Sequence, residues 1–282
     1  MSNGGAPAGV FGDRAGEWAS WQASPWGRLR YDVVRETTAR AVAALPGRLR
    51  VIDVGGGDGA DSLPLAARGH DVTVLDFAPD LLAQAEQAAE ARGVAGLVRV
   101  VSADLDDLVR GELPGDVPLG AFDVVLCHNV LHYRTDVPAT VRFLASLARP
   151  GGVVSVMAPN PAMDVLAAAI RRMDPERARA VLDSPTVHGE TFDHPMRRLE
   201  TDEVEQALAD AGGTVEHRFG IRCLMDLIAD DERKSEPDFY RRLLELELLL
   251  CEREPYWRTA RFWQLTARTG TAADGPATSD EG

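Results

Sequence analysis

The stretch RVIDVGGGDGA, residues 50–60, joins a short apolar run to a loop that contains four glycines. The run is typical of a buried strand over Arg50–Val54, because it is continuous and is followed by turn residues. The glycines permit a tight turn and let a ligand lie against the backbone. A helix is expected at Asp61–Arg68, and its first amides would point toward that ligand.

The same alternation of apolar runs and helical patterns continues on both sides of this stretch. Strands are predicted at Asp71–Phe77, Leu97–Ser102, Phe122–Cys127 and Val153–Met157, and helices at Gly27–Leu45, Pro79–Arg92 and Val137–Leu147. Strands that alternate with helices favour βαβ crossovers, and therefore an α/β fold with a parallel sheet covered on both faces. Two later strand patterns, Gly213–Ile221 and Phe262–Ala267, complete the sheet.

The rhythm breaks after the fifth strand. Residues 160–200 hold a helical pattern but no clean strand, so we expect a helical insertion on the substrate side of a single domain, 27–268. A helix begins after this insertion, and Thr201 is expected to cap it. Residues 1–26 are predicted to form a flexible N-terminal segment, and the polar residues 269–282 a disordered tail.

Composition narrows the class of protein. The chain has 282 residues, with 30 Lys+Arg against 44 Asp+Glu and a net charge of −14. This balance excludes a protein that coats nucleic acid non-specifically, because that affinity comes from cationic residues. The cysteines Cys127, Cys223 and Cys251 are too distant in sequence to indicate a disulfide framework, and we expect no metal site. Without a secretory signal or a long apolar stretch, a reduced, cytoplasmic protein that does not enter membranes is expected.

A carboxylate at the end of the second strand points to a nucleoside-containing cofactor. Asp76 can accept hydrogen bonds from both ribose hydroxyls of such a ligand. Gly55, Gly57 and Ala60 also satisfy the G-x-G-x-x-G/A pattern, so an NAD(P)-binding protein has to be considered. Asp58, however, sits inside the turn, where it is unfavourable beside a pyrophosphate and acceptable beside an ammonium. Together with the lack of a second mononucleotide-binding half, this favours S-adenosylmethionine.

Four segments together resemble the signature segments of class I S-adenosylmethionine-dependent methyltransferases. They are IDVGGGDG at 52–59, VLDF at 74–77, VVLCHNVLHY at 124–133 and LARPGG at 147–152. The resemblance implies an enzyme with a Rossmann-like, seven-stranded sheet. It also implies that the last strand, Phe262–Ala267, runs antiparallel between its neighbours.

Outside this core the chain is similar to the bacterial tRNA methyltransferases that esterify 5-carboxymethoxyuridine. The similar segments are GRLR at 27–30, RGHDV at 68–72, LELE at 244–247, CEREPY at 251–256, Arg261 and TAR at 266–268. The resemblance implies cofactor contacts from Arg30, Gly55, Gly56, Asp76, Asp104 and His128. From the loop and the strand end we add Asp53, Gly57 and Phe77 as cofactor-binding residues.

The acceptor of the methyl group is less determined than the cofactor. Cys223-Leu224-Met225 stands where that tRNA family has an aromatic–histidine pair, and the insertion matches poorly. The alternatives are therefore the carboxyl group of a modified tRNA wobble uridine and an O or N nucleophile on a small metabolite. A tRNA enzyme needs a basic stripe beside its pocket. The arginines available for one are Arg171, Arg172, Arg177, Arg179, Arg197, Arg198, Arg241 and Arg242.

Candidate catalytic residues follow the fourth strand. His128, His132 and Tyr133 lie where open α/β sheets bind ligands. A hydroxyl or amine acceptor needs a base, whereas a carboxylate acceptor needs none, so no catalytic residue is assigned. Arg222 and Arg261 are candidates to bind an anionic substrate, with surface ion pairing as the alternative, and Tyr256 to cover it, with packing as the alternative. The sequence leaves the oligomeric state open.

Overall fold

The computed structural model describes residues 20–115, 117–184, 186–188 and 195–270. The predicted flexible segment 1–26 and the predicted tail 269–282 lie mostly outside the described residues. Seven strands form one sheet in the order β3-β2-β1-β4-β5-β9-β8, and two more form a separate hairpin. The strands of the sheet are β1 Arg50–Val54, β2 Asp71–Asp76, β3 Val98–Ser102, β4 Phe122–His128, β5 Ala148–Pro159, β8 Gly213–Ile221 and β9 Phe262–Thr269.

The direction of the strands confirms the predicted fold class. β3, β2, β1, β4 and β5 pair in parallel. β9 is the last strand in sequence among the described residues, and it inserts antiparallel between β5 and β8. β8 therefore runs in the same direction as the first five strands, and the carboxyl ends of six strands meet at one edge of the sheet.

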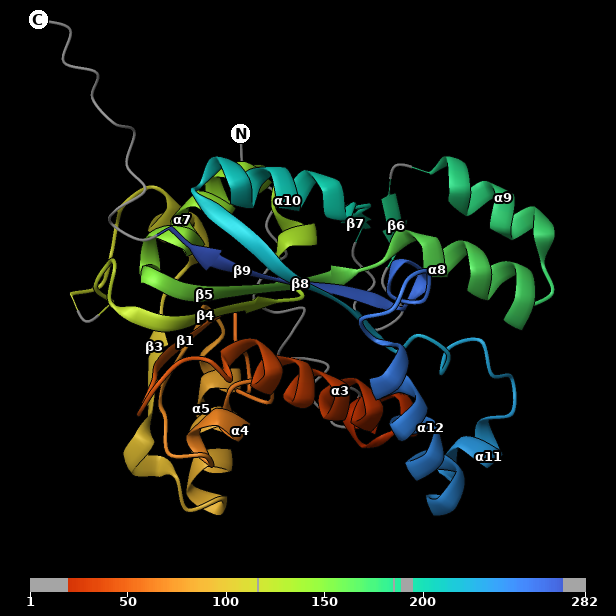
Figure 1. Ribbon diagram of the computed structural model, residues 1–282, viewed down its shortest axis with the longest axis horizontal. Coiled ribbons are helices and arrows are strands. Elements are labelled where there is room, and N and C mark those ends of the chain that lie inside the picture. Colours follow the sequence, from red (N-terminus) through yellow and green to blue (C-terminus); the bar gives the residue numbers. More distant parts are fainter. Residues whose placement is uncertain (1–19, 116, 185, 189–194, 271–282) are drawn as a thin grey trace, which may run out of the picture.

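Helices cover both faces of this sheet (Figure 1). α7 and α10 lie on one face, and α3, α5 and α12 lie on the other. The helices around the sheet are α3 Pro25–Val42, α4 Leu63–Ala66, α5 Pro79–Ala91, α6 Leu105–Val109, α7 Val137–Leu147, α10 Thr201–Asp210, α11 Asp231–Ser235 and α12 Pro237–Leu250. Short 3-10 turns occur at Ala95–Leu97, Leu131–Tyr133 and Trp257–Thr259.

Alternating side chains of the central strands form two cores. Ile52 and Val54 of β1 belong to the core beneath α7 and α10. Val51 points to the opposite face and belongs to a core with residues of α5, such as Leu82 and Ala85. This explains why the strand reads as a continuous apolar run, because successive residues of a strand point to opposite faces and here both faces are buried.

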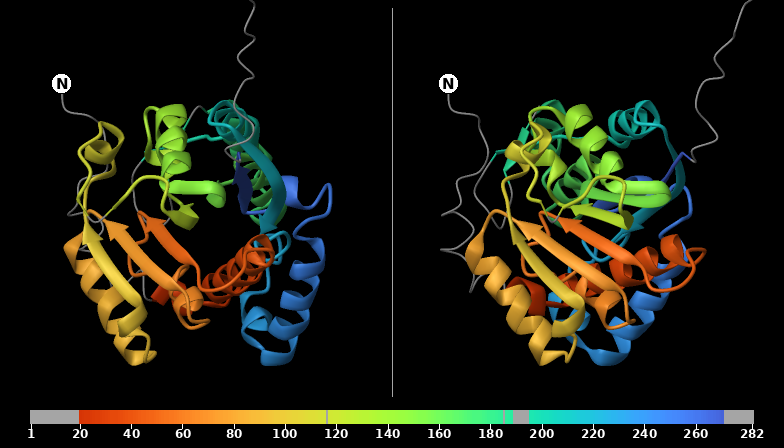
Figure 2. Two further views of the ribbon diagram at one scale, coloured as in Figure 1. Left: turned by 60° about the vertical axis from the view of Figure 1, so that its left-hand side comes forward. Right: turned by 90° about the vertical axis from the view of Figure 1, so that its left-hand side faces the viewer.

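The insertion after β5 contains more than helix (Figure 2). It consists of α8 Pro161–Leu166, a π-helical turn Ala167–Arg171, α9 Pro175–Asp183, β6 Thr186–His188 and β7 Pro195–Arg197. β6 and β7 pair antiparallel with each other. The expectation of no strand in this segment was wrong, because strands of three residues are too short to produce a periodic pattern.

Two other local predictions need correction. α10 begins at Thr201, but Glu200 is the N-cap and makes no side-chain capping bond, so Thr201 is not the cap. The Asp61–Arg68 helix is shorter than predicted, and only Leu63–Ala66 is α-helical. None of the helices in the described ranges is long and apolar enough to cross a membrane.

Candidate functional site at the carboxyl edge of the sheet

The loop after β1 depends on glycine. Gly55, Gly57 and Gly59 have φ values of +71°, +54° and +72°, which side chains rarely adopt. A Cβ on Gly55 would also lie 2.5 Å from Cγ2 of Val130, in the loop after β4. The two loops therefore pack directly against each other, and Gly55 allows that approach.

Asp76 ties this loop to the end of β2. Its carboxylate accepts hydrogen bonds from the backbone N–H of Gly57 and that of Ala78, both at 2.9 Å. Burial raises the pKa of Asp76, while the two N–H groups oppose the shift. The next residue, Phe77, is about one-third exposed, and Asp104 caps α6 by accepting from the N–H of Asp106 at 2.8 Å.

Asp53 lies beneath the glycine loop and has an unpaired oxygen. The residue is 2% exposed, and its Oδ2 has no hydrogen-bond partner among the described residues. A Cβ on Gly56 would come within 2.8 Å of that oxygen. Burial, and then the neighbouring Asp61 carboxylate, raise the pKa of Asp53 to about 7. Asp53 thus carries a carboxyl group that lacks a cationic partner.

Arg30, Asp61 and His128 form a buried cluster next to Asp53. Both terminal nitrogens of Arg30 donate to the Asp61 carboxylate, and the guanidinium also lies over the ring of Tyr31 at 4.4 Å. His128 Nδ1 is 2.9 Å from Asp61 Oδ2. Burial alone would raise the pKa of Asp61, but Arg30 and His128 hold it well below its usual range. Arg30 Nε is buried and has no described partner.

The two unpaired atoms, Arg30 Nε and Asp53 Oδ2, suit ligand groups of opposite charge. Arg30 Nε is a cationic donor, which suits a carboxylate. Asp53 Oδ2 is an acceptor next to further carboxylates, which suits an ammonium. Asp58, on the glycine loop, accepts from Gln22 Nε2 at 2.7 Å, so the start of the described chain contacts the same loop. The surplus of carboxylates over the single arginine fits a cofactor that is zwitterionic at one end and cationic overall, and it disfavours a pyrophosphate.

Three residues of this region were not predicted from the sequence. Asp61 follows the glycine loop, and Ser155 and Gln264 are buried polar residues in the strands β5 and β9. A signal for the last two was present, because each interrupts an apolar run. A buried polar side chain within such a run requires hydrogen-bond partners.

Of the three catalytic candidates, His128 ends β4, and His132 and Tyr133 lie against each other in the loop that follows. Both ring nitrogens of His128 are engaged, with Asp61 and with the Ser155 hydroxyl at 2.9 Å. His132 is 4% exposed, and burial lowers its pKa to about 3. Burial raises the pKa of Tyr133 to about 12, and its ring lies 4.1 Å from that of His132.

The predicted substrate residues divide into a cluster and a separate tyrosine. Arg222 makes two hydrogen bonds to Asp226, and Arg261 bonds Asp226 at 3.1 Å and Asp164 of α8 at 2.6 Å. The structure therefore brings Arg222 and Arg261 to one shared carboxylate, that of Asp226. Through Asp164, Arg261 also contacts α8, the first helix of the insertion. Tyr256 is 40% exposed on the turn before Trp257 and has no described bond to this cluster.

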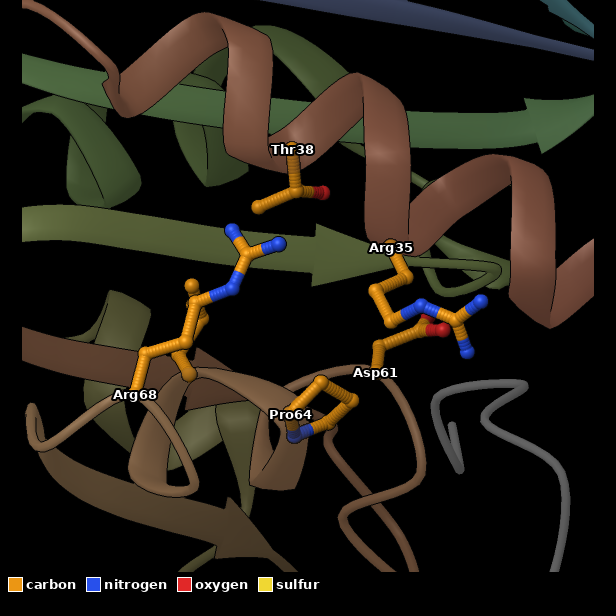
Figure 3. Close-up of a pocket in the computed structure, with 6 residues that line it drawn as sticks. Arg35, Thr38, Asp61, Pro64 and Arg68 are labelled. Atoms are coloured by element: carbon orange, nitrogen blue, oxygen red, sulfur yellow. The ribbon is translucent and has the colours of Figure 1, made fainter. Parts of the chain in front are cut away.

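A small recess lies on the other side of Asp61 (Figure 3). It leaves essentially no room for a sphere the size of a water molecule, whereas ligand pockets begin at roughly 300 Å³. The recess is therefore too small for a nucleoside, and the site rests on the loop and strand-end geometry above. Its lining residues are Arg35, Thr38, Asp61, Pro64, Leu65 and Arg68.

The described residues form neither a cluster of metal ligands nor a reactive thiol. Within the described ranges, no group of three His, Cys, Asp or Glu side chains is arranged to hold a metal ion. Cys127, Cys223 and Cys251 are free and buried. Burial raises the pKa of each thiol above its usual value, which disfavours a reactive thiolate.

Comparison with known sequences supports the chemistry of this site. A family profile described as a methyltransferase domain matches residues 52–154. The chain is 31% identical over 249 residues to the tRNA 5-carboxymethoxyuridine methyltransferase of Escherichia coli K12, covering 88% of this chain and 91% of that protein. It is 33% identical over 183 residues to a ubiquinone biosynthesis O-methyltransferase of Xanthomonas campestris, covering 64% of this chain and 71% of that protein.

Solved structures show the same fold at low identity. The magnesium protoporphyrin IX methyltransferase of Synechocystis, solved with bound SAH, aligns with a TM-score of 0.59 and 18% identity over 93% of this chain and 98% of that one. An S-adenosylmethionine-dependent methyltransferase of Mesorhizobium loti aligns with a TM-score of 0.54 and 23% identity, over 83% and 97% of the two chains.

Proposed function

Because this chain belongs to the class I S-adenosylmethionine-dependent methyltransferases, we propose that it methylates the carboxyl group of a 5-carboxymethoxyuridine at the wobble position of tRNA. The relative named for this modified uridine matches nearly the whole of both chains. At 249 aligned residues, the match extends well beyond the 52–154 range of the domain profile.

None of the three candidate bases is suited to accept a proton at neutral pH, and this favours a carboxylate as the acceptor of the methyl group. His128 has no free ring nitrogen. His132, with a pKa of about 3, is a poor proton acceptor at neutral pH, and Tyr133, with a pKa of about 12, stays protonated. A hydroxyl or amine acceptor would need one of them as a base. A carboxylate is already ionised and needs none.

For the cofactor, we assign roles to the unpaired atoms of the site. Arg30 Nε donates to the carboxylate of the methionine moiety, and Asp53 Oδ2 accepts from its ammonium. Gly55, Gly56 and Gly57 let the cofactor lie against the backbone, and Asp76 binds the ribose hydroxyls. Phe77 and Asp104 border the base. The roles of Arg30 and Asp53 are supported by atoms that the fold leaves unpaired. That of Asp76 is supported by the remaining acceptor capacity of its carboxylate, and the others by their position at this edge.

The chemistry then depends mainly on placement. S-adenosylmethionine supplies a methyl group on a sulfonium. The acceptor carboxylate forms the new O–C bond as the C–S bond breaks, the electron pair goes to sulfur, and no proton moves. The chain contributes in-line alignment and a field that suits a cation. Arg222 and Arg261 would hold the anionic acceptor, which requires that it compete with Asp226 and Asp164.

Nucleoside analysis tests this proposal. We expect tRNA from a deletion strain to lose the methyl ester of 5-carboxymethoxyuridine and to accumulate the free acid, as measured by mass spectrometry. The wild-type gene should restore the ester, and an Asp76→Ala gene should not. Asp71→Ala is the matched control, because Asp71 starts the same strand and forms an exposed ion pair with Arg48. Unchanged nucleosides in the deletion strain would exclude this substrate.

A small metabolite is the second candidate acceptor. The ubiquinone O-methyltransferase relative favours it, and so does the pairing of the predicted basic stripe. Arg171 forms an ion pair with Asp231, and Arg197 forms one with Glu203. Arg241 pairs with both Asp238 and Glu245. Unchanged tRNA nucleosides, together with loss of a methylated metabolite from extracts of the deletion strain, would favour this alternative. The cytoplasmic location stays a prediction in either case.

A further inference from the structure

A chain of buried hydrogen bonds runs from the cofactor site to the last strand. His128 Nε2 lies 2.9 Å from the Ser155 hydroxyl, and Gln264 Nε2 donates to that hydroxyl at 3.0 Å. Thr37 of α3 lies 2.6 Å from Gln264 Oε1. Thr37, Ser155 and Gln264 are at most 1% exposed. With Asp61 at its other end, this relay connects α3, β9, β5 and β4 to the site.

The donor and the acceptor of each hydrogen bond in the relay can be assigned. Asp61 is ionised, because its pKa is held low, so it can only accept, and His128 donates from Nδ1. The amide nitrogen of Gln264 is a donor, so the oxygen of Ser155 accepts from it. The hydroxyl proton of Ser155 is then free to point at His128 Nε2, which accepts it. With His128 as the neutral Nδ1–H tautomer, every contact has one donor and one acceptor, and the hydroxyl proton of Ser155 also has an acceptor.

We propose that Ser155 and Gln264 are positioning residues for the cofactor site, which hold His128 as its Nδ1–H tautomer and thereby fix Asp61 against Arg30. Both side chains are buried, so neither is expected to contact the cofactor. They act because an imidazole with a fixed N–H orients the carboxylate that it binds.

The consequence reaches Arg30 through Asp61. Both terminal nitrogens of Arg30 are bound to that carboxylate, which leaves Nε as the unpaired nitrogen that we assigned to the cofactor. A neutral His128 also adds no positive charge to a pocket that must receive a sulfonium. This inference needs only the cofactor, so it holds whether the acceptor is tRNA or a metabolite.

Gln264→Met tests the relay at its far end, with Thr266→Val as the matched control. Thr266 lies two residues further along β9 and faces the same side. It is equally buried, and its Oγ1 has no described partner. We expect Gln264→Met to raise the dissociation constant of S-adenosylmethionine by about tenfold, the value of one lost hydrogen bond of ordinary strength. Thr266→Val should change it by less than about twofold. Urea midpoints of both variants establish that they fold.

Nitrogen NMR of His128 provides a readout that a loss of stability would not move. In the full-length wild type at neutral pH, we expect one neutral tautomer with a protonated Nδ1 and an unprotonated Nε2. In Gln264→Met we expect this signature to shift, while it persists in Thr266→Val. A wild-type His128 that is doubly protonated, or protonated only at Nε2, would overturn the proposal. Wild-type cofactor affinity in a folded Gln264→Met variant would also overturn it.

Discussion

At the scale of single residues, Asp53 makes the stability of the cofactor-free protein depend on pH. Its folded pKa of about 7 lies above the unfolded value of roughly 3.9, so the folded state binds this proton more tightly. The resulting stabilisation is complete below about pH 4 and is lost as the pH rises through 7. Asp61 has the opposite shift, and its contribution is lost only in stronger acid.

Asp53→Asn removes the titrating group and keeps the shape of the side chain. We expect the melting temperature of the cofactor-free variant to fall less than that of the wild type between pH 5 and pH 8. Asp71→Asn, on the exposed start of β2, serves as the control and should follow the wild type. Parallel melting curves for wild type and Asp53→Asn across this range would show that Asp53 titrates outside it.

The glycine loop gives a second prediction at this scale. Gly55→Ala combines a positive φ with a clash against Val130, whereas Gly47 has a φ of +76° and nothing within 4 Å of an added Cβ. Gly47→Ala should therefore cost only about 1–2 kcal/mol of backbone strain. Gly55→Ala should cost at least about 1 kcal/mol more, because overpacking adds to the strain. Urea denaturation measures both, and equal costs would contradict the close packing of the two loops.

At the scale of elements, α12 holds the loop that follows β8. Glu247 is fully buried, and its carboxylate accepts from the backbone N–H groups of Cys223, Leu224 and Met225 at 2.5–3.0 Å. This loop carries Arg222, which has a φ of +64°. The helix therefore fixes the segment that presents one of the two substrate arginines.

Glu247→Gln should destabilise the protein by about 2–3 kcal/mol, because it replaces an acceptor by a donor facing backbone N–H groups. Glu245→Gln on the exposed face of the same helix should change stability by less than about 0.5 kcal/mol. Denaturant unfolding of the two variants gives the comparison. A Glu247→Gln variant as stable as Glu245→Gln would show that these three N–H groups have other partners.

The elements also show where sequence reasoning worked. The strand Gly213–Ile221 and the helix Val137–Leu147 were predicted with the bounds that the structure has. Arg149-Pro150-Gly151-Gly152 was predicted to separate a helix from the next strand. In the structure these residues lie within β5, and the pairing with β4 jumps from Ala148 to Val153. A bulge of this kind depends on the neighbouring strand, which local sequence does not reveal.

At the scale of the whole molecule, charge limits how the protein can contact RNA. Of the predicted basic stripe, Arg177 and Arg179 are exposed on α9 and form no ion pair with a described residue. If tRNA is the acceptor, the slope of log K against log salt should correspond to fewer than about four neutralised phosphates. Replacing both arginines with Gln should reduce that slope. Arg241→Gln should not reduce it, because Arg241 is already paired with Glu245. Filter binding across a salt series measures this, and a steep slope would reveal a basic surface elsewhere.

The overall architecture was predictable from a few motifs, whereas the connections within the site were not. The glycine loop, Asp76 and the βαβ rhythm sufficed for the sheet and the cofactor edge. Asp61, Ser155 and Gln264 come from three distant segments, and only the folded sheet brings them to His128. Their partners are long-range contacts, which composition and periodicity do not encode.

The position of β9 between β5 and β8 determines when the enzyme can become active during its synthesis. The ribosome makes Arg30, the glycine loop and His128 long before Gln264, and β8 has no neighbouring strand until β9 has left the exit tunnel. A nascent chain can therefore fold its first five strands while the far end of the relay is still missing. The cofactor site is therefore complete only after β9 has been synthesised, and a premature stop codon before β9 would leave a partly folded sheet with an unpaired edge.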